Sequence, residues 1–381
     1  MKKLKILLVI GTRPEGIKLY PVWKELKKYP TKFETRIVAT GQHEELIDQV
    51  FSLLKFSPDI SFDLMQPNQG LGSLSSNLIG TLTHCLLSER PDIVLVQGDT
   101  TSALMGALAA YYMKIRLGHV EAGLRTNYLF NPYPEEGNRR MIATLAGFHF
   151  APTQQAKENL LKENIPEDRI FVTGNTGIDA VRIVLESYPA KNPIPGLREE
   201  DFKNRHLILV TAHRRESFGK PLRNIEMALK KIAETSRKFL IVLPLHLNPI
   251  VQDAFSRLSE ISKNRTYPNI KVIPPLNYLE MLSCMQKAFL ILTDSGGLVE
   301  EASFLGKPVL ILREVTERPE SVEAGIAKIV GTSSGSIYNT FLQIACACKR
   351  KKIYKKMAVK KNLYGNGHAA EKIVKILPEL C

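Results

Sequence analysis

Two acidic side chains in the first half of the chain stand where predicted strands end. Asp99 follows an apolar strand within Gln97–Ser102, and Glu121 follows the next strand within His119–Thr126. Neighbouring carboxylates raise one another's pKa, which permits proton transfer near neutral pH. Taken alone, Asp99 fits equally well as the cap of the helix that follows it.

A third acid, Glu135, opens a predicted helix in the segment Tyr133–Arg140 and lies four residues before Arg139. An exposed ion pair along the helix is the simpler interpretation of that spacing. The density of acids and cations between residues 97 and 140, all near predicted strand ends, favours a site that moves protons.

Cations and small residues at other predicted turns suit an anionic ligand. The first turn, Gly11–Lys18, places Arg13 and Lys18 at a helix N-terminus, where free N–H groups attract phosphate oxygens. A capped helix with two solvated cations is an equally good interpretation. A G-x-G-x-x-G pattern does not occur in this turn, so a nicotinamide cofactor is not indicated.

The second half repeats this arrangement. His213, beside two arginines at a strand end, suits an anionic leaving group, although a structural histidine remains an alternative. The small residues Ser295, Gly296 and Gly297 allow a diphosphate to approach a helix N-terminus, and Glu301 lies one turn further on, where it can accept from ribose hydroxyls. Arg318 is a further phosphate-binding candidate.

Short apolar strands that alternate with amphipathic segments must position these residues. This alternation is typical of βα units around parallel sheets, in which ligands bind at the carboxyl ends of the strands. The predicted strands are Lys5–Ile10, Thr35–Ala39, Ile93–Val96, Leu117–Val120, His206–Val210, Phe239–Leu243, Lys271–Ile273, Phe289–Leu292 and Pro308–Leu312.

A length of 381 residues exceeds what one hydrophobic core usually organises. The proline-rich, charged stretch 188–205 is the best linker candidate. We therefore predict an α/β protein with two Rossmann-like domains facing a central cleft, over residues 1–172 and 173–365. A last helix over 366–381 is expected to pack back on the first domain.

A net charge of +14, with a lysine-rich run at 349–361, raises the question of nucleic acid. The run lacks interleaved stacking aromatics, so we interpret it as a solvated helical face, and a polyanionic small substrate explains the charge equally well. The five cysteines form no C-x-x-C pair, which predicts no zinc site, no disulfide framework and a reducing, cytoplasmic location. The apolar N-terminal run is expected to be a strand, and no run is long enough to span a bilayer.

Taken together, eight motifs in order along the chain resemble the non-hydrolysing UDP-N-acetylglucosamine 2-epimerases. They are Gly-Thr-Arg-Pro-Glu, Gln-Gly-Asp-Thr-Thr, His-Val-Glu-Ala-Gly-Leu-Arg-Thr, Pro-Glu-Glu-x-Asn-Arg, His-Arg-Arg-Glu-Ser, His-Leu-Asn-Pro, Thr-Asp-Ser-Gly-Gly and Thr-Glu-Arg-Pro-Glu. The resemblance implies a GT-B-like fold, a homodimer, and no metal, nicotinamide or other cofactor.

The resemblance also implies a reaction, in which UDP-GlcNAc becomes UDP-ManNAc by elimination of UDP to a 2-acetamidoglucal and its re-addition. The implied catalytic residues are Asp99, Glu121, Glu135, His213 and Lys18, with Asp99 and Glu135 ranked first for proton transfer. The implied substrate-binding residues are Arg13, Arg139, Ser295, Gly296, Gly297, Glu301 and Arg318. Gln42, His43 and Gln69 resemble part of an activator site for a second UDP-GlcNAc.

Two departures from the family pattern leave the substrate open. Pro275-Leu276-Asn277 replaces a usual Pro-Gln near the uracil, and Val299 replaces a common glutamine. The alternatives are a C2 epimerase of a 2,6-dideoxy or 2,3-diacetamido uronic UDP-sugar, a hydrolysing epimerase, a GT-B glycosyltransferase and a nucleotide-sugar sensor.

Overall fold

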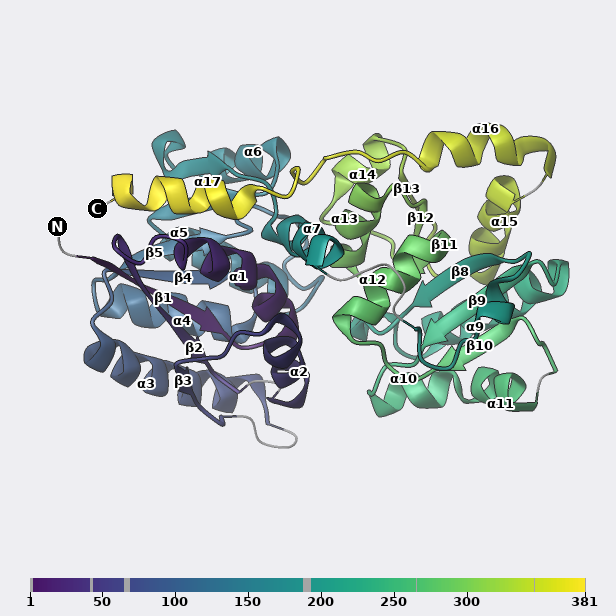
Figure 1. Ribbon diagram of the computed structural model, residues 1–381, viewed down its shortest axis with the longest axis horizontal. Helices are drawn as coiled ribbons and strands as arrows, with labels where there is room; N and C mark the ends of the chain where they lie inside the picture. Colours follow the sequence, from purple (N-terminus) through teal and green to yellow (C-terminus); the bar gives the residue numbers. More distant parts are fainter. Residues whose placement is uncertain are drawn as a thin grey trace. The chain divides into compact units, whose positions relative to one another are not determined.

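The chain forms two compact units in the computed structural model, which describes residues 3–41, 44–64, 69–187, 193–264, 266–345 and 347–380. The first unit comprises Met1–Ile183 together with Tyr364–Cys381, and the second comprises Val184–Leu363. Each unit is a parallel sheet with helices on its faces (Figure 1).

The first unit contains a seven-stranded parallel sheet in the order β3-β2-β1-β4-β5-β6-β7. Its strands are β1 (Leu4–Ile10), β2 (Phe33–Ala39), β3 (Ile60–Ser61), β4 (Ile93–Gln97), β5 (Arg116–Val120), β6 (Phe148–Ala151) and β7 (Ile170–Val172). Its helices are α1 (Arg13–Leu26), α2 (Glu44–Leu54), α3 (Leu71–Glu89), α4 (Thr101–Tyr112), α5 (Glu135–Leu145), α6 (Gln154–Lys162), α7 (Thr176–Ser187) and α17 (Ala369–Ile376), with short 3₁₀ turns at Glu167–Arg169 and Leu377–Leu380.

The central strands of this sheet are apolar without alternation. Every residue of β4 is buried, as are the last five residues of β1. Unbroken apolar runs are typical of parallel strands that helices cover on both faces. The candidate polar residues of this unit therefore lie in the turns at the strand ends and in the helices that follow them.

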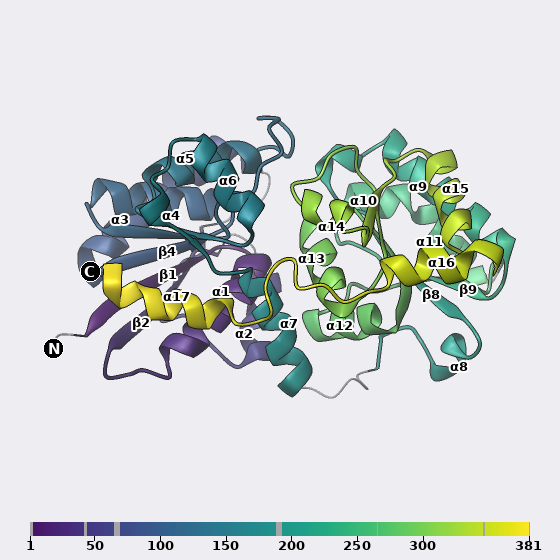
Figure 2. The same cartoon turned by 90° about the horizontal axis from the view of Figure 1, so that it is seen from above.

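The C-terminal helix α17 lies alongside α1 and is held by α7 (Figure 2). The carboxylate of Asp179 in α7 accepts hydrogen bonds from the backbone N–H groups of Ala369 and Ala370, at 3.1 and 2.8 Å. Arg182 Nε donates to the carbonyl of Gly367 at 2.7 Å. These contacts explain why most of α7 belongs to the first unit, whereas the sequence places this segment in the second domain.

The second unit contains a six-stranded parallel sheet in the order β10-β9-β8-β11-β12-β13. Its strands are β8 (His206–Thr211), β9 (Phe239–Pro244), β10 (Ile270–Ile273), β11 (Ala288–Thr293), β12 (Val309–Ile311) and β13 (Ala327–Ile329). Its helices are α8 (Glu199–Phe202), α9 (Lys220–Thr235), α10 (Pro249–Ala254), α11 (Ser256–Asn264), α12 (Tyr278–Lys287), α13 (Gly296–Leu305), α14 (Pro319–Glu323), α15 (Ser334–Ala345) and α16 (Ala347–Met357), with a 3₁₀ turn at Arg215–Ser217.

Both sheets have the Rossmann-like strand order, in which the direction of winding reverses once. The reversal lies between β1 and β4 in the first sheet and between β8 and β11 in the second. Ligands of open α/β sheets bind at such switch points, outside the carboxyl ends of the strands. A ligand-binding site is therefore expected in the turns after these four strands.

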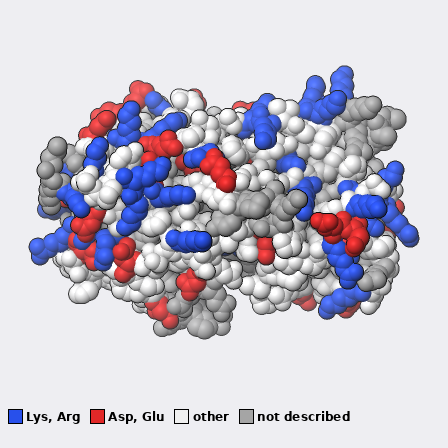
Figure 3. Space-filling view, viewed as in Figure 1, with Lys and Arg blue, Asp and Glu red and all other residues white. Residues whose placement is uncertain are grey.

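The lysine-rich run forms α16, and its described side chains have two faces. Lys352, Lys355 and Lys356 are exposed, and basic side chains project over α16 in Figure 3. Tyr354 and Met357 instead pack toward the hydrophobic core of the second unit. The prediction of a solvated helical face is confirmed for these residues.

Within the described ranges, no helix is long and apolar enough to cross a membrane. The same residues contain no group of three or more His, Cys, Asp or Glu side chains arranged to hold a metal ion. Cys85 and Cys284 are buried free thiols, and burial raises the pKa of these thiols to about 11 and about 12.

Candidate active site

The switch point of the first sheet brings together the turns after β1 and β4. Glu15, in the first turn of α1, is 1% exposed and lies between these turns. One of its carboxylate oxygens accepts from Gly11 N at 3.0 Å and from Thr12 Oγ1 at 2.8 Å. The other accepts from Thr100 Oγ1 at 2.7 Å. No role for Glu15 is predicted from the sequence.

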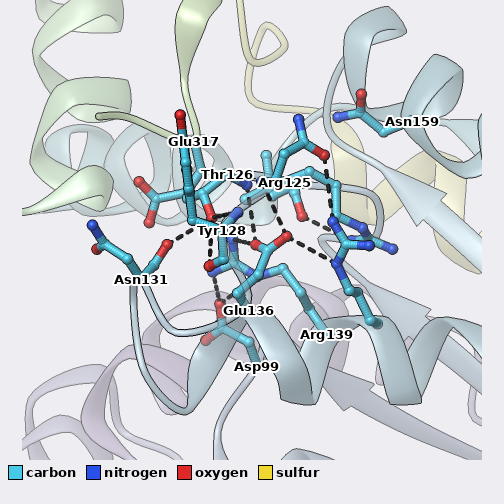
Figure 4. Close-up of polar contacts among 12 residues, drawn as sticks. Asp99, Arg125, Thr126, Tyr128, Asn131, Glu136, Arg139, Asn159 and Glu317 are labelled. Atoms are coloured by element: carbon cyan, nitrogen blue, oxygen red, sulfur yellow. Dashed lines mark hydrogen bonds and ion pairs between the residues drawn. The ribbon is translucent and has the colours of Figure 1, made fainter. Parts of the chain in front are cut away.

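Asp99, which is partly exposed, forms an ion pair with the buried Arg139 (Figure 4). Asp99 Oδ2 accepts from Arg139 Nε at 3.1 Å and also from Arg139 Nη2. Asn138 Nδ2 donates to the Asp99 carbonyl at 2.8 Å. Arg139 is only 4% exposed, so the simpler interpretation, an exposed pair along α5, does not describe this arginine. The helix α5 instead holds the turn that carries Asp99.

Glu136, rather than Glu135, is the fully buried acid of α5. Its carboxylate accepts from the backbone N–H groups of Thr126 and Asn127, at 3.0 and 3.3 Å. It also pairs with Arg139 at 3.3 Å and with Arg140 at 3.1 Å. Glu136 therefore fixes the segment after β5 against α5 (Figure 4), a role that sequence analysis missed.

Glu121 directly follows β5 and pairs with Lys18 of α1. Gln97 Nε2 donates to Glu121 Oε2 at 2.9 Å, which ties this carboxylate to the end of β4. Glu121 has a φ of +67°, a left-handed conformation that costs of order 1 kcal/mol in a non-glycine residue. Such strain is common at functional sites, and in this conformation the side chain contacts Lys18.

His119 supports the Asp99 turn from the adjacent strand. Its Nε2 lies 2.8 Å from the carbonyl of Gly98, the residue before Asp99. Burial lowers the pKa of His119 to about 4, so the ring is neutral at pH 7 and donates one hydrogen bond to this carbonyl. This neutral side chain therefore supports the turn through its hydrogen bond and does not carry a proton near pH 7.

Three further predicted residues of the first unit lie at element ends. Arg13 is the first residue of α1, and Glu135 is the partly exposed first residue of α5. Gln69 Nε2 contacts Ser73 Oγ at 3.5 Å, just before α3. Gln42 and His43 lie outside the described residues, so the activator site stays a prediction.

The switch point of the second sheet also has a buried carboxylate between two turns. Asp294, after β11, is 1% exposed, and its Oδ2 accepts from the backbone N–H groups of His213 and Arg214, each at 2.8 Å. Ser217 Oγ donates to the same oxygen at 3.3 Å. His213 Nδ1 lies 3.7 Å from Asp294 Oδ1, and its ring stacks on that of His246 with centroids 4.9 Å apart.

Ser295, Gly296 and Gly297 form the N-terminal end of α13, with Ser295 as the N-cap residue. A Cβ atom added to Gly296 would overlap the guanidinium of Arg318, so a larger residue at this position would displace that guanidinium. Arg318 Nε donates to Glu300 Oε1 at 2.7 Å, and its Nη1 lies 3.3 Å from Glu317 Oε1. A helix N-terminus with an adjacent guanidinium is a suitable site for a phosphate.

Glu301 lies in the first turns of the same helix. Its Oε1 accepts a hydrogen bond from the hydroxyl of Tyr278 in α12 at 3.3 Å. Asn277, which departs from the family pattern, caps α12 by accepting from Glu280 N at 3.0 Å. The structure therefore gives Asn277 a helix-capping role.

Comparison with known proteins decides the family. A sequence model described as UDP-N-acetylglucosamine 2-epimerase matches residues 24–378, which is most of the chain. This chain belongs to the UDP-N-acetylglucosamine 2-epimerase family. The resemblance inferred from eight motifs is thereby confirmed, and the enzyme class, an epimerase among the isomerases, is confirmed with it.

Individual relatives agree with this assignment. The UDP-N-acetylglucosamine 2-epimerase of Neisseria meningitidis is 44% identical over 378 residues, which cover 98% of this chain and 99% of the relative. A crystal structure of the enzyme from that organism, bound to UDP-GlcNAc, has a TM-score of 0.92 at 43% identity and covers 99% of this chain and 100% of the other. A Methanocaldococcus jannaschii structure with UDP-GlcNAc and UDP has a TM-score of 0.82 at 35% identity, with 99% and 100% covered. The predicted fold class, α/β with two Rossmann-like domains of GT-B type, is confirmed.

Proposed function

We propose that this enzyme inverts C2 of UDP-GlcNAc to give UDP-ManNAc. The observation that carries the proposal is a pair of carboxylates at the carboxyl edge of the first sheet, each held by a cation. Asp99 pairs with Arg139 and Glu121 pairs with Lys18, on adjacent strand ends. The names and bound molecules of the relatives support the same substrate.

The proposed first step removes the C2 proton while UDP leaves C1. The electrons of the C2–H bond form the C1–C2 double bond of a 2-acetamidoglucal, and the electrons of the C1–O bond move to the diphosphate. Because the C2 hydrogen is not acidic, the site must stabilise the charge that builds on the departing diphosphate. Re-addition of UDP with protonation of the opposite face of C2 completes the inversion.

Two faces of C2 must be served, so at least two proton-transfer groups are needed. We assign these roles to Asp99 and Glu135, with Glu121 as the third candidate. The contacts of Arg139 and Asn138 fix Asp99 on both its carboxylate and its carbonyl. A group held in this way meets the geometric demand of proton transfer.

The second unit supplies the proposed UDP site. The N-terminus of α13 with Arg318 offers amide donors and a guanidinium to phosphate oxygens. His213 and Arg13 are assigned to the same diphosphate, and Glu301 is assigned to the ribose hydroxyls. The His213 side chain is partly exposed, with its Nδ1 3.7 Å from Asp294 Oδ1, and a ring N–H held there suits hydrogen bonding to a leaving anion.

The test of this function is a panel of UDP-sugars incubated with the enzyme and followed by NMR. We expect UDP-GlcNAc to give UDP-ManNAc at equilibrium without free sugar. Free N-acetylmannosamine with UDP would indicate a hydrolysing epimerase, and turnover of only a deoxy or diacetamido uronic UDP-sugar would change the substrate. A product that appears only with an added acceptor would indicate a glycosyltransferase.

We also propose that the enzyme is a homodimer. Large apolar side chains are exposed on α3, α4 and α5, among them Leu87 at 51%, Tyr112 at 61% and Met141 at 49%. Light scattering of Tyr112→Glu is expected to give a molar mass that falls from that of a dimer toward that of a monomer, because the variant places a charge in this apolar surface. Met227→Glu, at a similarly exposed residue of α9, is the control and should leave the mass unchanged. A wild-type mass of one chain would contradict the proposal.

A further inference from the structure

Glu15 connects the two turns that carry proposed site residues of the first unit. Its bonds to Gly11 and Thr12 fix the backbone just before Arg13. Its bond to Thr100 fixes the residue just after Asp99. Thr100 Oγ1 also accepts from Ala103 N at 3.0 Å, so the same hydroxyl caps α4. One carboxylate therefore aligns α1, α4 and both turns.

Ionisation of this carboxylate is less favourable in the folded protein than in the unfolded chain. Burial raises the pKa of Glu15 from 4.5 to about 7, and the hydrogen bonds from Thr100, Thr12 and Gly11 only partly oppose that effect. The folded protein thus binds the proton more tightly than the unfolded chain does. Stability from this group is full below pH 4.5 and is lost as the pH rises toward 7. A buried acid whose contribution to stability declines toward neutral pH is a candidate for a functional role when its contacts also join two turns of a site.

We propose that Glu15 is a positioning residue, which fixes the turn that carries Arg13 against the turn that carries Asp99. The inference rests on the proposed function, in which Arg13 contacts the diphosphate and Asp99 transfers a proton. Asp294 occupies the corresponding place between the turns after β8 and β11. Each switch point therefore has one buried carboxylate that bridges its two turns.

The test compares Glu15→Gln with Glu25→Gln in the same helix. The glutamine keeps the shape of the side chain but replaces one acceptor oxygen with an NH2 group, so the Thr100 hydroxyl can no longer donate to this side chain and would have to accept instead. We expect kcat/KM for UDP-GlcNAc to fall by on the order of 10²-fold, the cost of misplacing a catalytic group by about 1 Å. Glu25 is 8% exposed and pairs with Lys28 at 2.6 Å, and its variant should keep wild-type rates.

Thermal unfolding at pH 8 separates positioning from a structural role. We expect the Tm of Glu15→Gln to equal or exceed that of the wild type, because the variant removes a buried charge. A Tm that falls together with activity would overturn the proposal, as would near-wild-type kcat/KM or an equal loss in Glu25→Gln.

A double-mutant cycle with Thr100→Ala tests the bridge itself. The losses in kcat/KM should be far from additive, because either change breaks the same connection; additive losses would overturn the inference. Calorimetry of UDP binding distinguishes this failure from failure of the proposed function. If the wild type binds UDP but epimerises no UDP-sugar, the proposed function is wrong. If Glu15→Gln binds UDP with unchanged affinity, Glu15 does not position Arg13, whatever the function.

Discussion

Asp99→Asn is expected to reduce epimerisation by at least 10³-fold while UDP still binds. The asparagine keeps the size of the side chain and its contact with Arg139 but cannot take a proton from C2. The turn itself should persist, because Asn138 binds the backbone carbonyl at this position. The measurements are initial rates by NMR and UDP affinity by calorimetry.

The matched control is Asp59→Asn, which changes an aspartate paired with an arginine elsewhere in the same unit. Asp59 Oδ1 lies 3.2 Å from Arg36 Nη1, and its Oδ2 accepts from the backbone N–H of Ile37 in β2. This variant should retain its rate. Near-normal turnover by Asp99→Asn would remove Asp99 from the proton-transfer groups, whereas loss of UDP binding would assign it to substrate binding.

Two adjacent acids of α5 are expected to give opposite phenotypes. Glu136→Gln should lower the free energy of unfolding by about 2 kcal/mol, because it removes one of the two charged partners of the buried Arg139 and weakens two backbone contacts. Glu135→Gln should abolish turnover with a much smaller loss of stability, because Glu135 is partly exposed. Urea denaturation and initial rates measure the two effects.

Each variant serves as the control for the other, since they differ by one position and carry the same chemical change. Equal losses of stability would contradict the distinction between an anchoring and a reacting carboxylate. Full activity in Glu135→Gln would leave Asp99 and Glu121 as the two groups that serve the faces of C2.

The long strands of both sheets could be predicted because their apolar runs end in polar turns. All nine predicted strands are present, with ends within two residues of those predicted. The missed strands β3, β6, β7 and β13 have only two to four residues, and mixed sequences such as Phe-His-Phe-Ala give no clear pattern. Their pairing depends on neighbours already in the sheet, which a local pattern does not contain.

The places of the site residues could also be predicted, because parallel strands bring their carboxyl ends to one edge. The sequence could not separate Glu135 from Glu136, since consecutive helical residues differ only in which of them faces the interior. The sequence does contain a pattern that indicates a structural role for Glu15. Thr12 and Glu15 have the T-x-x-E spacing of a capping box, although in the folded chain the glutamate reaches Gly11 N and the threonine hydroxyl.

The most direct test of the proposed chemistry is the epimerisation of UDP-GlcNAc in deuterated water. Removal of the C2 proton by a carboxylate and return of a solvent-derived proton predict UDP-ManNAc that carries one deuterium at C2 and none at C1 or C3. UDP-ManNAc that forms with its original hydrogen at C2 would contradict proton transfer through the side chains of Asp99 and Glu135.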